Sequence, residues 1–255
     1  MCCIHFKTNE QKWLRYQREE NEKVCTKIVE ELKAQEIRLL DKNKMVAEEY
    51  SNKLRKQLGE RLEKFYELML DLGWPPHLEM DVSEARKIID ISVSYDEKVL
   101  KKAINDHYIN KYNTKVINGF LNKWGQNRIF RKRILILEQA INAHIIGNYF
   151  LSTCTLISQL EGIIADSENH IGKMRESKLK EYLGKRVVGR EKYSFGYAFK
   201  RFYNKKLYCN FEHGRCIASP ISRHAILHGA DIVYGTEVNS LKVILISDNL
   251  FHYFA

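Results

Sequence analysis

An arginine and a histidine near the C-terminus have the chemical properties needed to cleave a phosphodiester. Arg223 and His228 stand five positions apart in the segment Arg-His-Ala-Ile-Leu-His. A guanidinium holds a phosphate with a planar, charge-assisted pair of hydrogen bonds. An imidazole transfers protons near neutral pH. Together they are sufficient for cleavage without a metal ion, although the spacing alone is common enough to arise by chance.

Two further side chains are candidates for the same site. His224 follows the arginine and, in a helix, would lie one turn before His228. Glu161 falls on or beside the apolar stripe of an expected helix over residues 149–166, where a carboxylate needs a partner. We expect Arg223 to be that partner. The alternative is an ion pair of Glu161 with another lysine or arginine that has no catalytic meaning.

A zinc site is the main chemical alternative. His224 and His228 have the spacing of helical metal ligands, and Asp231 or Glu237 could complete the set. The residues between the histidines include no glutamate where a metalloprotease base is required. Three further potential ligands stand at irregular spacing: Cys209, His213 and Cys216. The sequence also has no phosphate-cradling glycine loop, and we expect neither a metal nor another cofactor.

A segment that mixes aromatic and basic residues precedes the arginine. Residues 193–208 alternate rings with lysines and an arginine, a pattern that suits stacking on unpaired bases and neutralising phosphates. The candidate RNA-binding residues in it are Lys200, Arg201, Tyr203, Lys205 and Lys206. The formal charge of +10 and the pI near 9.2 also favour a polyanionic partner. The alternative is a helix whose rings pack on the core while its lysines face water.

The composition indicates an all-α protein. The chain has 255 residues, 29% of them charged, and only three prolines and 13 glycines interrupt it. Its most apolar region, residues 145–164, contains Asn148, Gln159 and Glu161, so we expect no membrane span. The six cysteines form no regular framework and the first residues do not resemble a signal peptide. Reduced thiols and a cytoplasmic location are therefore expected.

The N-terminal third is expected to be a helical arm. From about Gln11 to Leu72 the sequence is charge-rich, and its later apolar residues alternate four and three apart, as in a coiled coil or helical hairpin. That seam comprises Leu58, Leu62, Phe65, Met69 and Leu72, and a looser stripe upstream comprises Ile28, Leu32, Leu39 and Leu40. Gly73-Trp-Pro-Pro76 ends the arm. We expect the arm to fold back or to pair with another copy.

A second region, residues 81–255, is expected to be a helical domain that follows the arm of residues 1–80. Asp81 or Ser83 would cap its first helix, and Thr236 its last. The expected helices cover about 83–92, 96–112, 114–124, 127–146, 149–166 and 236–250. Residues 167–218 are less regular.

The C-terminal half resembles the HEPN superfamily. The segments that carry the resemblance are Leu156-Ile-Ser-Gln-Leu-Glu-Gly162, Ser222-Arg-His-Ala-Ile-Leu-His-Gly229 and Tyr234-Gly-Thr-Glu-Val-Asn-Ser-Leu-Lys242. They look like the apolar helix before the motif, the arginine–histidine motif and the closing helix of bacterial HEPN proteins of the phage-defence and abortive-infection kind. The similarity covers roughly residues 125–255. The long aromatic and basic segment before the motif departs from the pattern.

The resemblance implies a four-helix-bundle endoribonuclease that needs no metal and commonly forms a dimer. By position, Arg223 would bind the scissile phosphate, His228 would act as general acid or base, and His224 would assist in holding the substrate. Attack by the ribose 2′-hydroxyl would leave a 2′,3′-cyclic phosphate and a 5′-hydroxyl. A toxin or antiphage role implies an antitoxin or regulatory protein. The alternative is a non-catalytic RNA- or protein-binding module with an oligomerisation arm.

Overall fold

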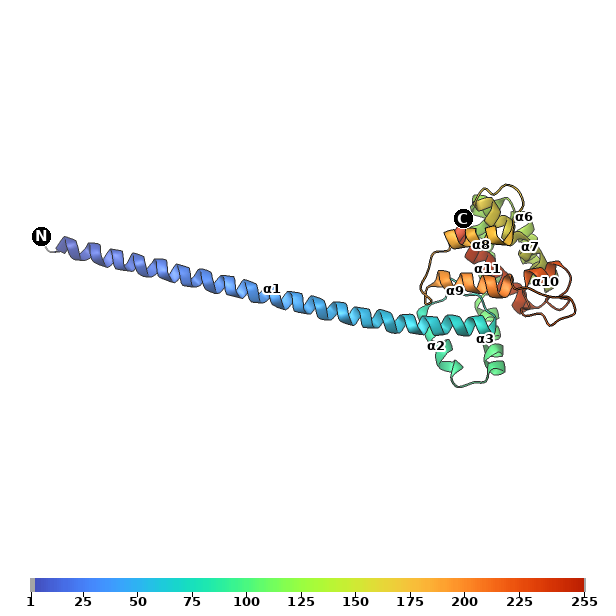
Figure 1. Cartoon of the computed structure of the whole chain (residues 1–255), viewed down its shortest axis with the longest axis horizontal. Coiled ribbons are helices and arrows are strands. Elements are labelled where there is room, and N and C mark those ends of the chain that lie inside the picture. Colours follow the sequence, from blue (N-terminus) through green and yellow to red (C-terminus); the bar gives the residue numbers. More distant parts are fainter. Residues whose placement is uncertain (1–2, 255) are drawn as a thin grey trace. The chain divides into compact units, whose positions relative to one another are not determined.

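The structure of the chain is a computed structural model that describes the backbone of residues 3–254 and the side chains of residues 23, 27, 30, 31, 33–35 and 37–254. This part of the chain contains helices and no strand, which confirms the all-α prediction (Figure 1). The helices up to the middle of the chain are α1 (Cys3–Leu72), α2 (Val82–Ser92), α3 (Glu97–Lys111), α4 (Thr114–Gln126), α5 (Arg128–Arg131) and α6 (Ile134–Ile145). They are followed by α7 (Tyr149–Ser167), α8 (Glu176–Arg186), α9 (Phe195–Phe202), the π-helical segment η1 (Tyr203–Leu207), α10 (Arg223–Leu227) and α11 (Glu237–Phe254).

The chain divides into two compact units between Gln57 and Leu58. This boundary is earlier in the sequence than the one expected at residue 80. The apolar seam explains the difference. Phe65, Met69 and Leu72 are buried in the core of the second unit, so the last turns of α1 belong to that unit. The arm does not fold back as a hairpin within the described residues, because α1 continues without a break to Leu72.

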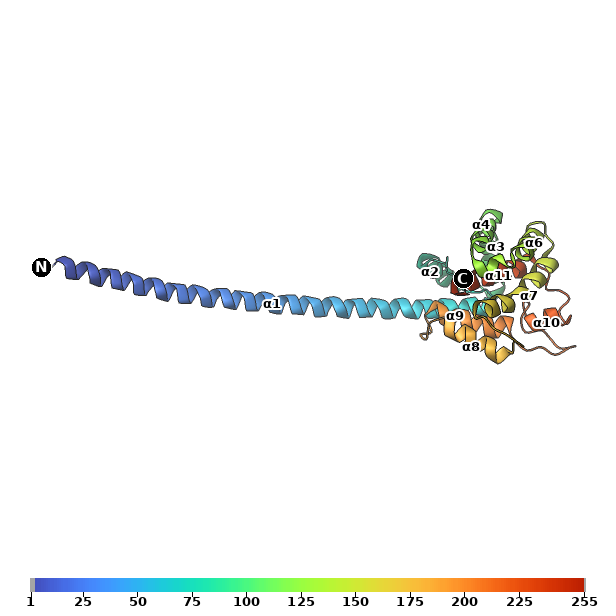
Figure 2. The same ribbon diagram turned by 90° about the horizontal axis from the view of Figure 1, so that it is seen from above.

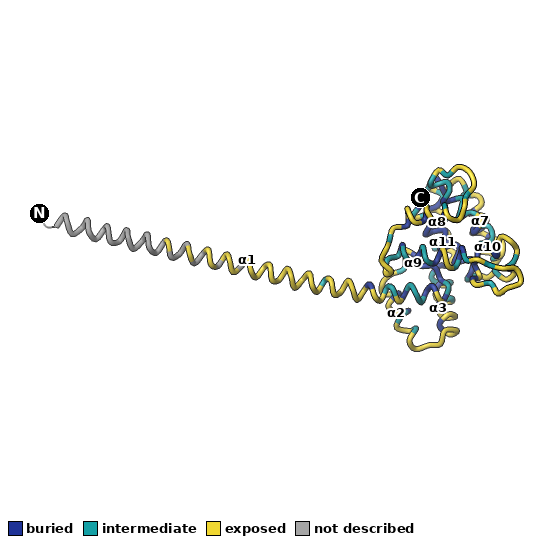
Figure 3. Tube along the Cα trace, viewed as in Figure 1, coloured by how far each residue is buried: buried dark blue, intermediate teal, exposed yellow. Residues whose placement is uncertain are grey.

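The first unit consists of the earlier turns of α1. Its described apolar side chains are exposed, among them Leu39 and Leu40 of the looser stripe (Figure 3). The side chains of Ile28 and Leu32 lie outside the described residues. Pairing of this unit with another copy stays a prediction.

Polar residues at the helix starts explain several element boundaries. The Oδ1 of Asp81 accepts a hydrogen bond from the amide of Glu84 at 2.8 Å, and the Oγ1 of Thr236 accepts one from Asn239 at 3.2 Å. Each bond satisfies an amide that has no partner within its helix. Both sequence-based cap predictions are therefore confirmed, with Asp81 rather than Ser83 in the first case.

Helix α11 forms the centre of the second unit. It packs against α7, α6, α4 and α3, and all its residues from Asn239 to Leu250 are buried (Figures 2 and 3). The expected apolar face of α7 is fully buried and comprises Leu156, Ile157, Leu160, Ile163 and Ile164. Helix α9, which the sequence did not define, lies beside the last turns of α1, where Arg201 pairs with Glu67. None of the described helices combines the length and apolar composition that a membrane crossing requires.

The expected helix over residues 127–146 is divided into α5 and α6 around Arg133. The guanidinium of Arg133 turns toward α7, where NH1 donates to Gln159 at 3.0 Å and NH2 to Asp166 at 2.9 Å. It crosses α7 at Gly162, where a Cβ atom would lie 2.5 Å from NH2. The absence of a side chain at Gly162 therefore allows the contact between α5, α6 and α7.

We expect Gly162→Ala to lower the free energy of unfolding by about 1–3 kcal/mol, because the added methyl group displaces the Arg133 guanidinium from its partners. Urea denaturation measures the change. Gly119→Ala in α4 is the matched control, since a Cβ there meets nothing within 4 Å. The control should raise stability by up to about 1 kcal/mol through helix propensity. Equal effects of the two substitutions would contradict the packing argument.

Candidate functional site

The arginine–histidine motif forms the short helix α10 and the residue that ends it. The hydroxyl of Ser222 accepts a hydrogen bond from the amide of Ala225 at 3.3 Å and so fixes the start of the helix. Gly229 has a φ of 73°, in the left-handed region where a glycine ends a helix without strain. His228 therefore occupies the C-terminal end of α10, where its side chain is exposed to solvent.

Arg223 is held in place by a carboxylate of α7 and a tyrosine ring. Its NH2 lies 2.9 Å from the Oε2 of Glu161, and its Cζ lies 5.6 Å from the centre of the Tyr208 ring. The hydroxyl of Tyr208 donates to the other oxygen of Glu161 at 2.8 Å. The prediction that Arg223 is the partner of Glu161 is confirmed. The catalytic roles of both residues stay predictions.

The two imidazoles lie beside this arrangement. The rings of His224 and His228 are nearly parallel, with centroids 6.3 Å apart, and the His224 ring meets the Tyr208 ring edge-on at 5.6 Å. Phe211, in the segment between η1 and α10, stacks on His228 with ring centroids 5.9 Å apart. Burial first, and then the charge of Arg223, lower the pKa of His224 below its ordinary value. The shift favours the neutral form of His224, which is able to accept a proton.

The cluster has the chemical groups that phosphoryl chemistry needs. One nitrogen of the Arg223 guanidinium is bound to Glu161, whereas its buried Nε has no hydrogen-bond partner in the structure. A fixed guanidinium stabilises charge that develops on a phosphate oxygen, and paired imidazoles move protons to and from the reacting oxygens. The structure thus brings together all four predicted catalytic residues: Glu161, Arg223, His224 and His228.

The aromatic and basic segment differs from the prediction. Tyr203 is 0% exposed, so its ring packs in the core and is not available to stack on a base. The side chain of Lys200 donates to the carbonyl of Gly189 at 3.2 Å, and Arg201 pairs with Glu67. Lys205 is exposed and Lys206 is partly buried. The prediction of a base-stacking role for Tyr203 is wrong, because the rings of α9 and η1 face the core as the alternative predicted.

The potential zinc ligands do not gather. Among the residues that the structure describes, no three His, Cys, Asp or Glu side chains come together in a way that could hold a metal ion. His224 and His228 lie together without a third such ligand, and Cys209, His213 and Cys216 do not form a set. The geometry therefore does not favour the two zinc alternatives.

Comparison with family models, with characterised proteins and with solved structures finds no match for this chain. The resemblance to the HEPN superfamily stays a prediction.

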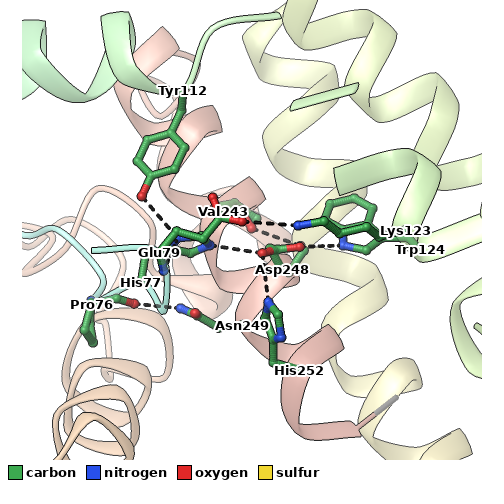
Figure 4. A network of polar contacts seen from close by, with 11 residues as sticks. Pro76, His77, Glu79, Tyr112, Lys123, Trp124, Val243, Asp248, Asn249 and His252 are labelled. Carbon is green, nitrogen blue, oxygen red and sulfur yellow. Dashed lines mark hydrogen bonds and ion pairs between the residues drawn. The ribbon is translucent and has the colours of Figure 1, made fainter. Parts of the chain in front are cut away.

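A second polar cluster, which the sequence analysis missed, surrounds Asp248 of α11 (Figure 4). The indole N–H of Trp124 donates to Oδ1 at 2.9 Å, and the Nε2 of His77 lies 3.1 Å from Oδ2. The Nε2 of His252 lies 3.5 Å from the same oxygen. The hydroxyl of Tyr112 lies 3.1 Å from the Nδ1 of His77. This arrangement suits a His77 tautomer that donates from Nε2 to Asp248 and accepts from Tyr112.

The Asp248 cluster is buried and joins distant segments. The side chains of His77 and Asp248 are both 0% exposed. Asn249, the next residue, donates to the carbonyl of Pro76 at 2.7 Å. Burial alone would raise the pKa of Asp248, but the hydrogen bonds from His77 and Trp124 and the adjacent imidazoles lower it below its ordinary value. Because His77 and Asp248 are closed off from solvent, we interpret the cluster as a structural element that fixes the turn after α1 against α4 and α11.

We expect Asp248→Asn to lower the free energy of unfolding by about 3 kcal/mol at pH 7, because donors of His77 and Trp124 lose a buried charged acceptor. Asp106→Asn, on the exposed surface of α3, is the control and should change the free energy of unfolding by less than about 0.5 kcal/mol.

The same variant predicts a pH dependence. Because the folded-state pKa of Asp248 lies below the unfolded value of about 3.9, its stabilisation is present above that pH and is lost as the pH falls through the folded pKa. The stability difference between the wild type and Asp248→Asn should therefore shrink below about pH 4. A difference independent of pH from 7 to 2 would contradict this interpretation.

Proposed function

We propose that this protein is a metal-independent endoribonuclease whose site comprises Arg223, His228, His224 and Glu161. The observation that carries the proposal is a guanidinium fixed by Glu161 at 2.9 Å beside two nearly parallel imidazoles. The site lies at the end of a short helix, with His228 exposed and Arg223 partly exposed. These side chains are accessible to a phosphate that approaches from solvent. An ion pair with a purely structural role would not require this exposure.

The proposed reaction is an internal transfer within RNA. The ribose 2′-oxygen attacks the adjacent phosphorus, and the bond from phosphorus to the 5′-oxygen breaks. His224, whose neutral form is favoured, is suited to accept the 2′-hydroxyl proton, and His228 would donate a proton to the leaving 5′-oxygen. Arg223 would stabilise the extra negative charge on the phosphate oxygens. The products are a 2′,3′-cyclic phosphate and a 5′-hydroxyl.

The charge of the chain supports RNA as the substrate. The proposed reaction uses the 2′-hydroxyl, so DNA would not be cleaved. The chain has a formal charge of +10, which attracts a polyanion from solution. Lys205 of η1 is exposed and available for phosphate contacts, whereas Tyr203 is buried and not available for stacking.

Assembly through the first unit is part of the proposal. A single exposed helix is marginally stable in water, and this unit exposes a series of large apolar side chains: Ile37, Leu39, Leu40, Met45, Val46, Tyr50 and Leu54. Ile37, Leu40 and Leu54 fit one heptad seam. We propose that this seam pairs with a second copy of the chain.

The cellular role that fits such an enzyme is that of a toxin or antiphage effector in the cytoplasm. A nuclease that cleaves cellular RNA needs restraint, so an antitoxin or another regulatory protein is the expected partner.

Cleavage of a 5′-labelled single-stranded RNA in the presence of EDTA tests the activity. We expect Arg223→Ala and His228→Ala each to lower the cleavage rate by about 10²- to 10⁴-fold, because they remove charge stabilisation or proton transfer. His213→Ala is the matched control, since His213 is exposed and contacts the neighbouring Phe211. Circular dichroism would show that all variants keep the fold.

The same assay separates the alternatives. RNA with 2′-O-methyl groups at every position should resist cleavage, and the RNA products should carry cyclic phosphates. If the wild-type protein binds RNA tightly without cutting it, the non-catalytic binding module is correct. If both site variants cut as fast as the wild type, the proposed site is wrong.

Analytical ultracentrifugation tests the assembly. We expect Leu40→Glu to weaken self-association by about tenfold or more, because each buried leucine contributes about 1.5–3 kcal/mol. Gln35→Glu introduces the same single negative charge about 140° around the helix and should have little effect. A monomeric wild-type protein at all concentrations would contradict the pairing.

A further inference from the structure

An aromatic residue beside the proposed site, Phe211, lies outside the hydrophobic core. It belongs to the irregular segment between η1 and α10, and its side chain is partly exposed. Among the described residues, neither the buried core nor the partly buried apolar side chains packed against it include Phe211. A single exposed ring on a protein surface is ordinary, so its neighbours must decide whether it has a role.

The neighbours of Phe211 are the imidazoles of the proposed site. Its ring stacks on the ring of His228 with planes 24° apart, and the planes of His228 and His224 are 14° apart. The ring of His213 meets Phe211 at 74°, so these two rings are not stacked on one another. Within the described part of the chain, His228 is the one ring stacked on Phe211, and the other face of the phenyl ring has no stacking partner.

These contacts belong to a series of rings that leads outward from the core. The ring centroids of Tyr208, His224, His228 and Phe211 follow one another at 5.6, 6.3 and 5.9 Å. Tyr208 is buried beneath the guanidinium of Arg223, whereas His228 is exposed and Phe211 is partly exposed. A phosphate that contacts the guanidinium and the imidazoles adjoins a sugar that carries a base. Phe211 is therefore the apolar ring that borders the phosphate position on the solvent side.

The chemistry of a phenyl ring favours an unpaired base as its ligand. Every base has a π face, and an uncharged ring binds it by stacking without reading its hydrogen-bonding edge. A base inside a duplex is covered by its neighbours and does not offer this face, whereas a base in a single strand or loop does. A purine has the larger face and stacks more strongly than a pyrimidine, so we expect a preference for purines.

We propose that Phe211 is a base-stacking residue that binds an unpaired purine next to the scissile phosphate. This inference rests on the proposed function, because it assumes that Arg223 and His228 contact the backbone of RNA. It assigns the stacking role, which the buried Tyr203 cannot have, to a ring that solvent reaches. The substrate class becomes single-stranded or looped RNA with a purine at the cleavage position.

Binding of RNA that cannot be cleaved measures the stacking separately from the reaction. The probes are a fluorescent 2′-O-methyl oligoadenylate and an abasic oligomer of the same length and charge, and fluorescence anisotropy measures their affinities. Stacking of one base on an aromatic ring contributes a factor of about 5 to 150 in affinity. We expect Phe211→Leu to weaken binding of the oligoadenylate about tenfold, since leucine keeps only part of the apolar contact. Phe211→Tyr retains the ring and should bind like the wild type.

The abasic oligomer separates base stacking from structural support of His228. It should bind the wild type and Phe211→Leu equally, because it has no base to stack. If Phe211 only held the imidazole in place, Phe211→Leu would weaken binding of both oligomers by the same factor. Tyr95→Leu, at an exposed ring between α2 and α3, is the matched control and should leave both affinities unchanged. A 2′-O-methyl oligouridylate should bind the wild type several-fold more weakly than the oligoadenylate.

Three results would overturn the base site: no binding of the oligoadenylate by the wild type, equal binding by Phe211→Leu, or the same loss on both oligomers. Equal binding of oligouridylate and oligoadenylate by the wild type would overturn the purine preference. The nuclease proposal fails separately. If the oligoadenylate binds through Phe211 but unmodified RNA is not cleaved, the nuclease is wrong and the base site stands. If RNA is cleaved with the same KM by the wild type and Phe211→Leu, the base site alone is wrong.

Discussion

The buried carboxylate of Asp248 is the interaction on which the second unit depends. It accepts hydrogen bonds from Trp124 of α4 and from His77, which follows α1, and it lies in the central helix α11. A buried carboxylate is unfavourable unless hydrogen-bond donors satisfy its oxygens. The fold must therefore bring the donors of both Trp124 and His77 to Asp248. The requirement fixes three segments that are far apart in the chain. It also explains why the turn contains Gly73-Trp-Pro-Pro76: two prolines give the extended path that directs His77 inward.

The packing of this core determines where the candidate catalytic cluster lies. Helix α11 packs against α7, and the buried face of α7 places Glu161 at the edge of the core rather than within it. Glu161 then determines where the guanidinium of Arg223 lies, and Tyr208 limits its other side. Helix α10 is short, and the burial of Ala225 and Ile226 together with the ion pair to α7 gives the motif its orientation. A structural and a catalytic role for Glu161 are thus compatible, since a fixed guanidinium is also a preorganised one.

The position of Glu161 beside an apolar stripe correctly predicts that it has a partner, and the same sequence signal is present at Asp248. Both carboxylates fall on or beside the apolar face of a helix, where a carboxylate needs a partner. Asp248 follows Leu241, Ile244 and Leu245 at helical spacing, which is the available signal. Its partners could not be predicted, because His77 and Trp124 are 171 and 124 residues away in the chain. Periodicity also leaves open which face of an aromatic and basic helix points inward, so the burial of Tyr203 became evident only from the packing of α9 and η1 against the core.

Helix α11 carries two buried ionisable groups, and the contrast between them indicates which one is structural. Asp248 has all the partners that a buried charge needs, and replacing any partner leaves an unsatisfied donor or acceptor. Lys242 lies six residues earlier, about 240° around the helix, and has an aromatic face and two other lysines instead of a counter-charge. A methionine or leucine would pack against Trp74 at lower cost in free energy. Asp248 is therefore the buried charge on which the fold depends, because its hydrogen bonds join segments that are far apart in the chain.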